Sequence, residues 1–294
     1  MKFSIVWFLV FLISVSLTHG QPGGLHQASW MRPDGPVYAM TRHGDTLIMG
    51  GSFTNFSYPV HGGISLNDSN ALPVAGWENF YADGAVLTAI PDGQGGWYIG
   101  GTFREINGQK QGRLARIAAD GTLYPWNPNM SGNVYSLSLC GNTLYVGGYF
   151  KKVGQIVRKY LAAFDITTGG LTTWSPDPGT FVKQLTASNG RVFIMREYSN
   201  LGCIDSATGS FTSWQIVTAG GPVNSIYAHG NTVYLAGKFH TVNGFTRTKV
   251  AAVDNITGAP LPWSPTISGT EVIDADILGN KILLAGYFNM VNGL

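Results

Sequence analysis

Short apolar runs that end in Gly-Gly or Ala-Gly, followed by an aromatic residue, recur along the chain. The run at 143–150 reads TLYVGGYF, and related runs stand at 46–53, 96–103, 232–239 and 281–288. Apolar side chains occupy adjacent positions in each run, so we expect both faces of the predicted strands to be buried. No long stretch carries apolar residues at helical spacing. The pattern therefore predicts an all-β protein.

Each apolar run belongs to a longer repeat that begins with a valine. The starting valines are Val37, Val86, Val134, Val182, Val223 and Val272. Behind the glycine pair come a third apolar strand, such as LAAFD at 161–165, a turn of the form D-x-x-T-G, and a strand with a tryptophan. The tryptophans are Trp30, Trp77, Trp126, Trp174, Trp214 and Trp263. A period of about 48 residues with four short strands predicts a β-propeller of four-stranded blades.

Differences between the copies bear on the number of blades. The fourth copy has FIMREY (193–198) where the glycines are expected and is about eight residues shorter. The last copy stops at VNGL (291–294), after two strands, whereas the chain opens with an unattached tryptophan strand, QASWM (27–31). We expect about five full blades plus a partial sixth. We expect the N-terminal strand to close the ring as the outer strand of the last blade. Because the last blade lacks its third strand, either it is incomplete or the chain is a fragment of a longer protein, and we favour the fragment.

Turn chemistry explains the aspartates that recur once per repeat, Asp165, Asp205 and Asp254. Aspartate accepts hydrogen bonds from the backbone of its own turn, and the glycine of the turn supplies a positive φ. A glycosidase needs two carboxylates about 5–10 Å apart, and residues spaced one per blade would lie too far apart. We therefore assign the aspartates and the tryptophans to the structural motif. The glycine pair is expected either to let neighbouring blades approach or to support a bulge.

The first twenty residues have the pattern of an export signal. Lys2 precedes a stretch from Ile5 to Leu17 that is almost wholly apolar, and small residues follow near Gly20. This predicts a secretory signal peptide over 1–20, with an uncleaved anchor as the alternative. Residues 21–294 form the predicted propeller domain. The expected location is secreted, periplasmic or cell-surface, without membrane insertion after the signal is cleaved.

The charge and cysteine content of the chain limit which partners and which covalent crosslinks we expect. Charged residues make up 12% of the chain and the net charge is +2, so no nucleic-acid partner is predicted. The two cysteines, Cys140 and Cys203, are too few for a disulfide framework; they are expected to be buried thiols, although pairing stays open. No catalytic residue and no cofactor-binding residue is predicted.

Two segments of the chain carry a resemblance to a known family of repeats. The segment GNTLYVGGYFKKVGQIVRKYLAAFDITTGGLTTWSP (141–176) resembles the Delta-60 repeat of secreted bacterial β-propellers, and residues 230–265 match as closely. The resemblance covers essentially all of 37–294. It implies a module of exported or surface proteins, with no activity common to the family. The segment LGCIDSATGSFTSW (201–214) is similar, more weakly, to the tryptophan-docking repeats of quinoprotein dehydrogenases, which share the chemistry of the blade.

Two kinds of side chain are candidates for ligand binding. Only the last repeat places two carboxylates on one face of its first strand, Asp274 and Asp276, which predicts a Ca²⁺ or polar-ligand site. Two solvated carboxylates at an exposed edge are the alternative. Basic residues gather after the glycine pair in three repeats: Arg104 and Lys110; Lys151, Lys152, Arg158 and Lys159; Lys238, Arg247 and Lys249. They predict either a surface for acidic glycans or an ordinary solvated face.

The sequence favours a non-catalytic propeller that acts as a binding scaffold for an extracellular protein or polysaccharide. The repeats are nearly uniform, and the chain lacks a clear pattern of nucleophile and base. One alternative is a propeller enzyme, either a hydrolase or a quinoprotein-like oxidoreductase, with its site in the channel. Another is a purely structural spacer in a longer surface protein.

Overall fold

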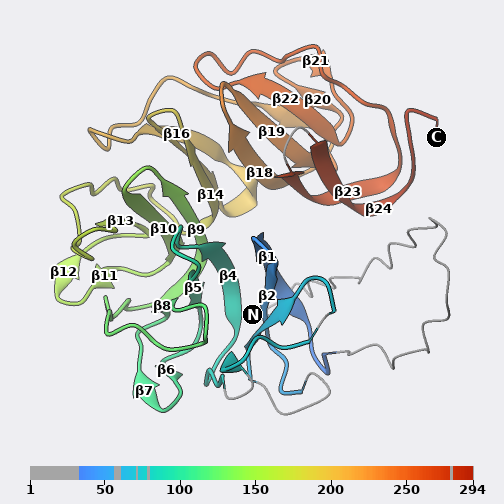
Figure 1. Cartoon of the computed structure of the whole chain (residues 1–294). Coiled ribbons are helices and arrows are strands. Elements are labelled where there is room, and N and C mark those ends of the chain that lie inside the picture. The colour runs from blue at the N-terminus through green and yellow to red at the C-terminus, as the bar shows by residue number, and fades with distance from the viewer. Residues whose placement is uncertain (1–32, 56–60, 71, 78–79, 279–280, 294) are drawn as a thin grey trace, which may run out of the picture. The chain divides into compact units, whose positions relative to one another are not determined.

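Regular structure in the chain is almost entirely β-strand (Figure 1). This computed structural model describes residues 33–55, 61–70, 72–77, 80–278 and 281–293. The predicted signal peptide and Trp30 lie outside the described residues. Among the residues described, the six repeats each form a main sheet in which the strands pair in chain order.

The bounds of the strands follow the repeats. The first two sheets are β1 (Val37–His43), β2 (Thr46–Gly51) and β3 (Gly63–Asn67), then β4 (Val86–Pro91), β5 (Trp97–Gly101) and β8 (Leu114–Ile117). The next two are β9 (Asn133–Cys140), β10 (Thr143–Tyr149) and β13 (Leu161–Asp165), then β14 (Val182–Ser188), β15 (Arg191–Arg196) and β16 (Leu201–Asp205). The last two are β18 (Val223–His229), β19 (Thr232–Gly237) and β22 (Val250–Asp254), then β23 (Ile267–Leu278) and β24 (Lys281–Val291).

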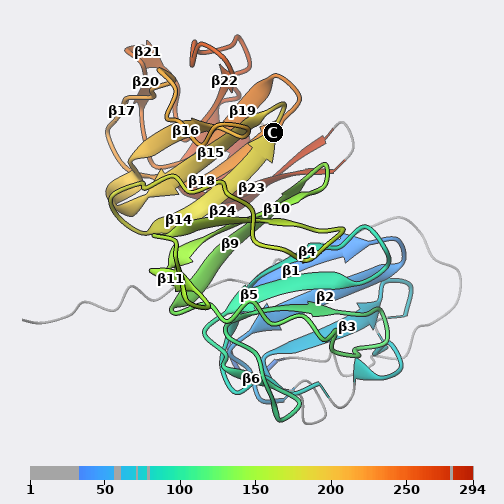
Figure 2. The same cartoon turned by 90° about the vertical axis from the view of Figure 1, so that its left-hand side faces the viewer.

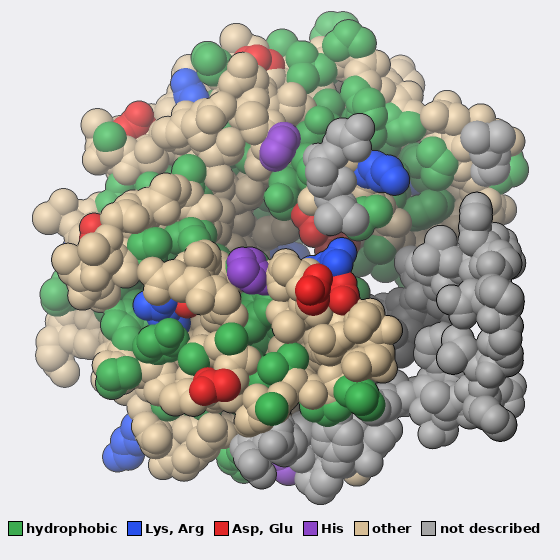
Figure 3. Space-filling view, in the orientation of Figure 1, with side chains coloured by type: hydrophobic (Ala, Val, Ile, Leu, Met, Phe, Trp, Pro, Cys, Tyr) green, Lys and Arg blue, Asp and Glu red, His purple; other side chains and the backbone are tan. Residues whose placement is uncertain are grey.

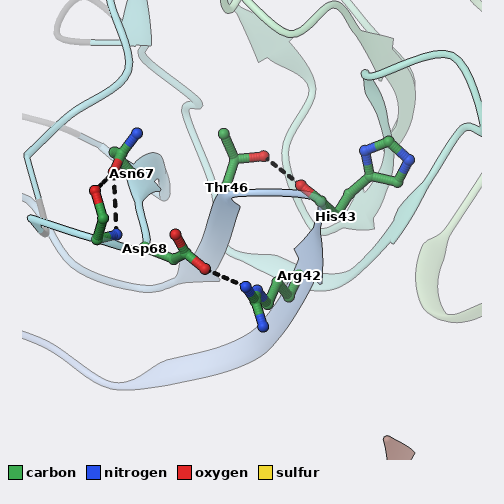
Figure 4. Close-up of polar contacts among 6 residues, drawn as sticks. Arg42, His43, Thr46, Asn67 and Asp68 are labelled. Carbon is green, nitrogen blue, oxygen red and sulfur yellow. Dashed lines mark hydrogen bonds and ion pairs between the residues drawn. The ribbon is translucent and has the colours of Figure 1, made fainter. Parts of the chain in front are cut away.

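The chain divides into two compact units. Unit 1 comprises Met1–Gln111 and Ala115–Pro125, and unit 2 comprises Gly112–Leu114 and Trp126–Leu294. In unit 1 an ion pair joins Arg42 of β1 to Asp68, which directly follows β3, and at the turn between β1 and β2 the Thr46 hydroxyl donates to the His43 carbonyl at 2.9 Å (Figure 4). In unit 2 the first strands β9, β14, β18 and β23 succeed one another side by side (Figures 1 and 2).

The two glycines of the repeat have separate roles. A Cβ on Gly147 would lie 2.8 Å from the Leu185 side chain and 2.9 Å from that of Val182, so this glycine lets the next sheet approach. A Cβ on Gly148 would lie 2.1 Å from the Asn133 carbonyl, where the register of β9 and β10 shifts by one residue. That shift is a β-bulge. Both expected roles therefore occur, one at each position.

The expected fourth strand is shorter than the repeat pattern predicts. After the turn that follows β13, the Thr172 amide donates to the Ala163 carbonyl at 2.9 Å, and only the isolated bridge from Phe164 to Leu171 is formed. Equivalent single bridges follow β3, β8, β16 and β22. The first five sheets are thus three-stranded with a short outer segment. Proline follows the tryptophan of this segment, as at Pro176, and has no N–H group with which to extend the pairing.

Small hairpins that the apolar pattern did not predict lie between the second and third strands of three repeats. They are β6 (Glu105–Ile106) with β7 (Gln109–Lys110), β11 (Lys152–Val153) with β12 (Ile156–Val157), and β20 (Thr241–Val242) with β21 (Phe245–Thr246). The first and third turn through Asn-Gly pairs with positive φ at both residues, such as 47° at Asn243 and 80° at Gly244. That geometry suits a two-residue hairpin turn. β20 also pairs with the short β17 (Thr218–Ala219).

Apolar side chains fill the space between successive sheets of unit 2. Phe193 from β15 and Trp214 pack in one cluster with Val223 and Phe239 of the next repeat. The aromatic residue that follows the glycine pair is buried at Phe150 (1% exposed). This agrees with strands whose two faces are both covered, as the adjacent apolar positions predict.

Candidate ligand-binding grooves

The polar residues that follow each starting valine join the first strands of unit 2. The Ser136 hydroxyl accepts a hydrogen bond from the Leu185 amide at 3.0 Å. One sheet further on, the Gln184 side-chain oxygen accepts from the Ile226 amide at 2.9 Å. The same contact recurs two residues along each strand, from the Ala187 amide to Ser138 and from the Ala228 amide to Thr186. These positions hold neighbouring sheets together.

Asp274 and Asp276 continue this series on β23. The Ser225 hydroxyl donates to Asp274 Oδ1 at 2.6 Å. Asp274 is exposed, although protein atoms surround its carboxyl group. The partial desolvation of this carboxyl raises its pKa, and the charge of the neighbouring Asp276 raises it further. In the described part of the chain, no group of three or more His, Cys, Asp or Glu residues is placed to hold a metal ion. The calcium site stays a prediction.

Asp165, Asp205 and Asp254, called here the turn aspartates, lie in three equivalent turns. In the first, Asp165 Oδ1 accepts from the Thr168 amide at 2.8 Å, the Thr168 hydroxyl at 3.1 Å and the Thr167 amide at 2.9 Å. These hydrogen bonds, led by the one from the Thr168 amide, lower the pKa of Asp165. The other two turns repeat the contacts and the direction of the shift. The carboxylates are occupied by their own turns.

Each of four tryptophans donates a hydrogen bond from Nε1 to a carbonyl in the turn of the following repeat. The partners are Trp77 to Ala119 (2.8 Å), Trp126 to Gly169 (2.8 Å), Trp174 to Asp205 (3.2 Å) and Trp214 to Asp254 (3.1 Å). We call this the tryptophan–turn contact. Trp263 is partly buried and makes no such bond within the described residues. Because this hydrogen bond links one repeat to the next, the recurring tryptophan has a structural role.

The cysteines are unpaired. Cys140 is half-buried and Cys203 is buried, and both are free thiols. Burial raises the pKa of the Cys203 thiol, which disfavours the reactive thiolate form.

Six of the nine basic residues noted in the sequence fall into two groups. Arg158 donates to the carbonyl of Thr172 at 2.9 Å, and Arg247 donates to that of Leu261 at 2.8 Å, so both hold the outer segment of their sheets. Lys249 is buried, and its amino group donates to the Ile267 carbonyl at 3.1 Å. These three side chains are committed to the fold. The lysines around the β11–β12 hairpin remain exposed.

Those lysines border a groove of about 380 Å³, called here the basic groove. Its lining residues are Lys151, Lys152, Val157, Lys159, Tyr160, Asp177 and Gly179. The amides of Lys151 and Lys152 both donate to the Ser131 hydroxyl, at 3.0 and 2.9 Å, which fixes the backbone that carries their side chains. Lys159 forms an ion pair with Asp177 at 2.8 Å, and this interaction raises the pKa of Lys159 and lowers the pKa of Asp177. The groove therefore has a surplus of positive charge.

Aromatic rings stand beside the basic groove. Tyr149 is 54% exposed, and its ring centroid lies 6.1 Å from that of Tyr160 and 5.8 Å from that of Phe181. Phe181 also contacts Tyr135, with the centroids 6.1 Å apart. A packed cluster of this kind offers a rigid aromatic face next to free lysines. Sequence reasoning missed it because the four rings come from separate elements.

A second groove, of about 540 Å³, occupies the equivalent place one repeat later. We call it the repeat-4 groove; its lining residues are Tyr198, Ser199, Asn200, Leu201, Ile216, Val217, Thr218, Gly221 and Pro222. Each groove lies between the segment that follows a second strand and the segment that leads into the next first strand. Both volumes fall in the range of about 300–1,000 Å³ that is usual for small-molecule sites. The shortened fourth repeat was the signal for this groove in the sequence.

Charges elsewhere on the surface are sparse. On the face drawn in Figure 3, acidic and basic side chains are few among polar and hydrophobic ones. In the part of the chain that the structure describes, no helix has the length and apolar character needed to cross a membrane.

Comparisons with known proteins address the fold. A family model described as "Domain of unknown function (DUF5122) beta-propeller" matches residues 91–123. No curated protein matches the sequence.

Two solved structures resemble this chain. One is the computationally designed Ika8 protein, with a TM-score of 0.56 and 13% identity over 85% of this chain and 68% of that chain. The other is the WD40 domain of Pan2 from Neurospora crassa, with a TM-score of 0.50 and 14% identity over 77% of this chain and 65% of that chain. The chain thus spans about two thirds of each, and identities this low bear on the fold alone. WD40 repeats form propeller blades. Our chain is therefore an all-β protein with a β-propeller fold.

Proposed function

We propose that the protein is a non-catalytic binding module that holds an acidic polysaccharide in the basic groove of unit 2. The observation that carries the proposal is the pair Lys151 and Lys152. Neither forms an ion pair with a described residue, and both flank a groove of suitable size. Two unpaired cations with a fixed backbone favour an anionic ligand.

The aromatic cluster supports a sugar as the anionic ligand. Tyrosine presents a rigid apolar ring and a hydroxyl group at low entropic cost, which suits a surface that is apolar on its C–H face and polar at its edge. Tyr149 supplies such a ring, exposed and with its centroid 6.1 Å from that of Tyr160, which lines the basic groove. A pyranose ring with a carboxylate or sulfate group offers both kinds of partner.

Export belongs to the same proposal. Residues 1–20 have the pattern of a signal peptide, and the Delta-60 resemblance is to exported repeat proteins. The match to a β-propeller family model over residues 91–123 supports the propeller part of this resemblance. Acidic polysaccharides are abundant outside cells, so location and ligand class agree.

The test is a binding measurement on the full chain with polygalacturonate as the acidic probe and dextran as the neutral one. We expect polygalacturonate to bind and added salt to weaken it, because salt screens exposed charges. Replacing Lys151 and Lys152 by glutamine should weaken binding about tenfold, equivalent to about 1.4 kcal/mol.

The matched control replaces Lys238 and Lys281 by glutamine, which removes the same charge from exposed lysines outside the groove. Equal weakening in the control would show that net charge is responsible and would refute the site. Release of new reducing ends from the bound polymer would refute the non-catalytic assignment and favour the hydrolase alternative.

A further inference from the structure

The fourth repeat exposes an aromatic side chain at a position that other repeats bury. Phe53, Phe103, Phe150 and Phe239 follow the glycine pair and are at most 2% exposed. Aligned on the strand pairing, Tyr198 takes the same place after β15 and is 91% exposed. The ring of Tyr198 is therefore fully available for contact with a ligand.

The backbone turns Tyr198 outward. Tyr198 has φ 56° and ψ 30°, and Ser199 has φ 59°, so two successive residues other than glycine adopt the left-handed conformation. Arg196, at the position of the second glycine, donates to Asn200 Oδ1 at 2.7 Å, and the Ser199 hydroxyl donates to the Val223 carbonyl at 2.8 Å. These bonds hold the turn in an unfavourable conformation. Strain that the surroundings maintain in this way is concentrated at binding and catalytic sites.

The repeat-4 groove lies beside this turn because the hairpin is missing. Ten residues separate Phe150 from Leu161 in the third repeat, but only two separate Tyr198 from Leu201 in the fourth. The missing segment corresponds to the β11–β12 hairpin. Val217, 68% exposed, borders the resulting groove together with Tyr198. No charged side chain is among the described residues that line it.

The two grooves are successive members of one series in unit 2. They occupy equivalent places in the third and fourth repeats, and the first strands of these repeats, β9 and β14, pack together. The first groove is lined by three lysines, whereas the second is aromatic and uncharged. A polymer that passes from one to the other therefore meets a charged site and then a neutral stacking site.

We propose that the repeat-4 groove is a second subsite for the polysaccharide, in which Tyr198 stacks on an uncharged sugar ring or on the C–H face of an acidic one. This inference rests on the proposed function, because the basic groove supplies the first point of attachment. It specifies the ligand as a chain long enough to reach two consecutive repeats. A short acidic oligosaccharide should occupy the basic groove alone.

The experiment compares polygalacturonate with trigalacturonate on the full-length protein. Tyr198→Ala should weaken the polymer at least fivefold and leave the trisaccharide within twofold, whereas the Lys151 and Lys152 double variant should weaken both. Tyr198→Phe should retain polymer binding, because the ring is kept. The matched control is Phe245→Ala, which removes an aromatic ring that is 57% exposed and lines neither groove.

The outcomes separate the two proposals. If Tyr198→Ala binds the polymer normally while the double lysine variant is impaired, the second subsite is refuted and the basic groove stands. If both bind normally, or if the wild-type chain binds neither probe, the proposed function fails. An equal loss in Phe245→Ala would also refute a specific role for Tyr198. Because Tyr198 is exposed, unchanged melting of Tyr198→Ala is the expected check on folding.

Discussion

Replacing Trp214 by phenylalanine tests whether the tryptophan–turn contact stabilises the fold. The indole is 3% exposed, and its Nε1 group donates to the Asp254 carbonyl at 3.1 Å. That carbonyl also accepts from the Gly258 amide at 3.0 Å, so it keeps a partner in the variant. The loss is therefore one neutral hydrogen bond, about 1 kcal/mol, plus about 1 kcal/mol for the smaller ring in a packed cluster. We expect Trp214→Phe to lower the free energy of unfolding by about 2 kcal/mol.

Urea unfolding of the full chain, followed by circular dichroism, measures this change. The matched control is Trp263→Phe, because Trp263 is only partly buried and its indole makes no hydrogen bond among the described residues. We expect the control to lose less than about 1 kcal/mol. Coincident transitions by circular dichroism and fluorescence are required for the comparison to be valid. Equal losses in the two variants would refute the role of the hydrogen bond.

Three further predictions concern the backbone, acid and calcium. Gly148→Ala should lower the free energy of unfolding by about 3 kcal/mol, because the new Cβ would lie 2.1 Å from the Asn133 carbonyl. The control Gly141→Ala should lower it by about 1 kcal/mol, because the new Cβ meets open space and only the φ of 55° is unfavourable. Equal melting temperatures of the two variants would contradict this prediction. The pKa of each turn aspartate is lowered below its ordinary value of 3.8, so its stabilising effect is complete above that value and is lost as pH falls through the lowered pKa. The urea concentration at the midpoint of unfolding should therefore decrease once the pH is lowered below about 4. A midpoint concentration that stays constant down to about pH 2 would refute a stabilising role of the turn aspartates. Any rise in melting temperature caused by calcium should disappear when Asp274 and Asp276 are both changed to asparagine; a retained rise would exclude this pair.

Features carried by the pattern of residue types along the chain could be predicted from the sequence. Adjacent apolar residues around Gly147 indicated strands that are buried on both faces, and the spacing of the tryptophans indicated the propeller repeat. The separate roles of Gly147 and Gly148 could not be resolved, because they depend on atoms of Leu185 and Asn133 that are distant in sequence. The hairpins were missed because strands of two residues are too short to show an apolar period. The Asn-Gly turns of the first and third hairpins were the signal available.

The candidate site was less accessible to sequence reasoning. Lys151 and Arg158 are both basic residues of one loop, yet the first borders a groove and the second donates to the Thr172 carbonyl. Only the fold distinguishes them. The short fourth repeat was visible in the sequence, but the exposure of Tyr198 depends on left-handed backbone angles that composition does not encode.

The tryptophan–turn contact has a consequence for how such a chain changes during evolution. The donor is a side chain, whereas the acceptor is a backbone carbonyl, as between Trp174 and Asp205. Most side chains of the accepting repeat can therefore be exchanged without a matching substitution in the repeat before it. A repeat can be duplicated, lost or transferred, and its neighbours still present a compatible indole and carbonyl. The geometry of the contact between repeats thus recurs along the chain, while the exposed side chains of each repeat can change to bind different ligands.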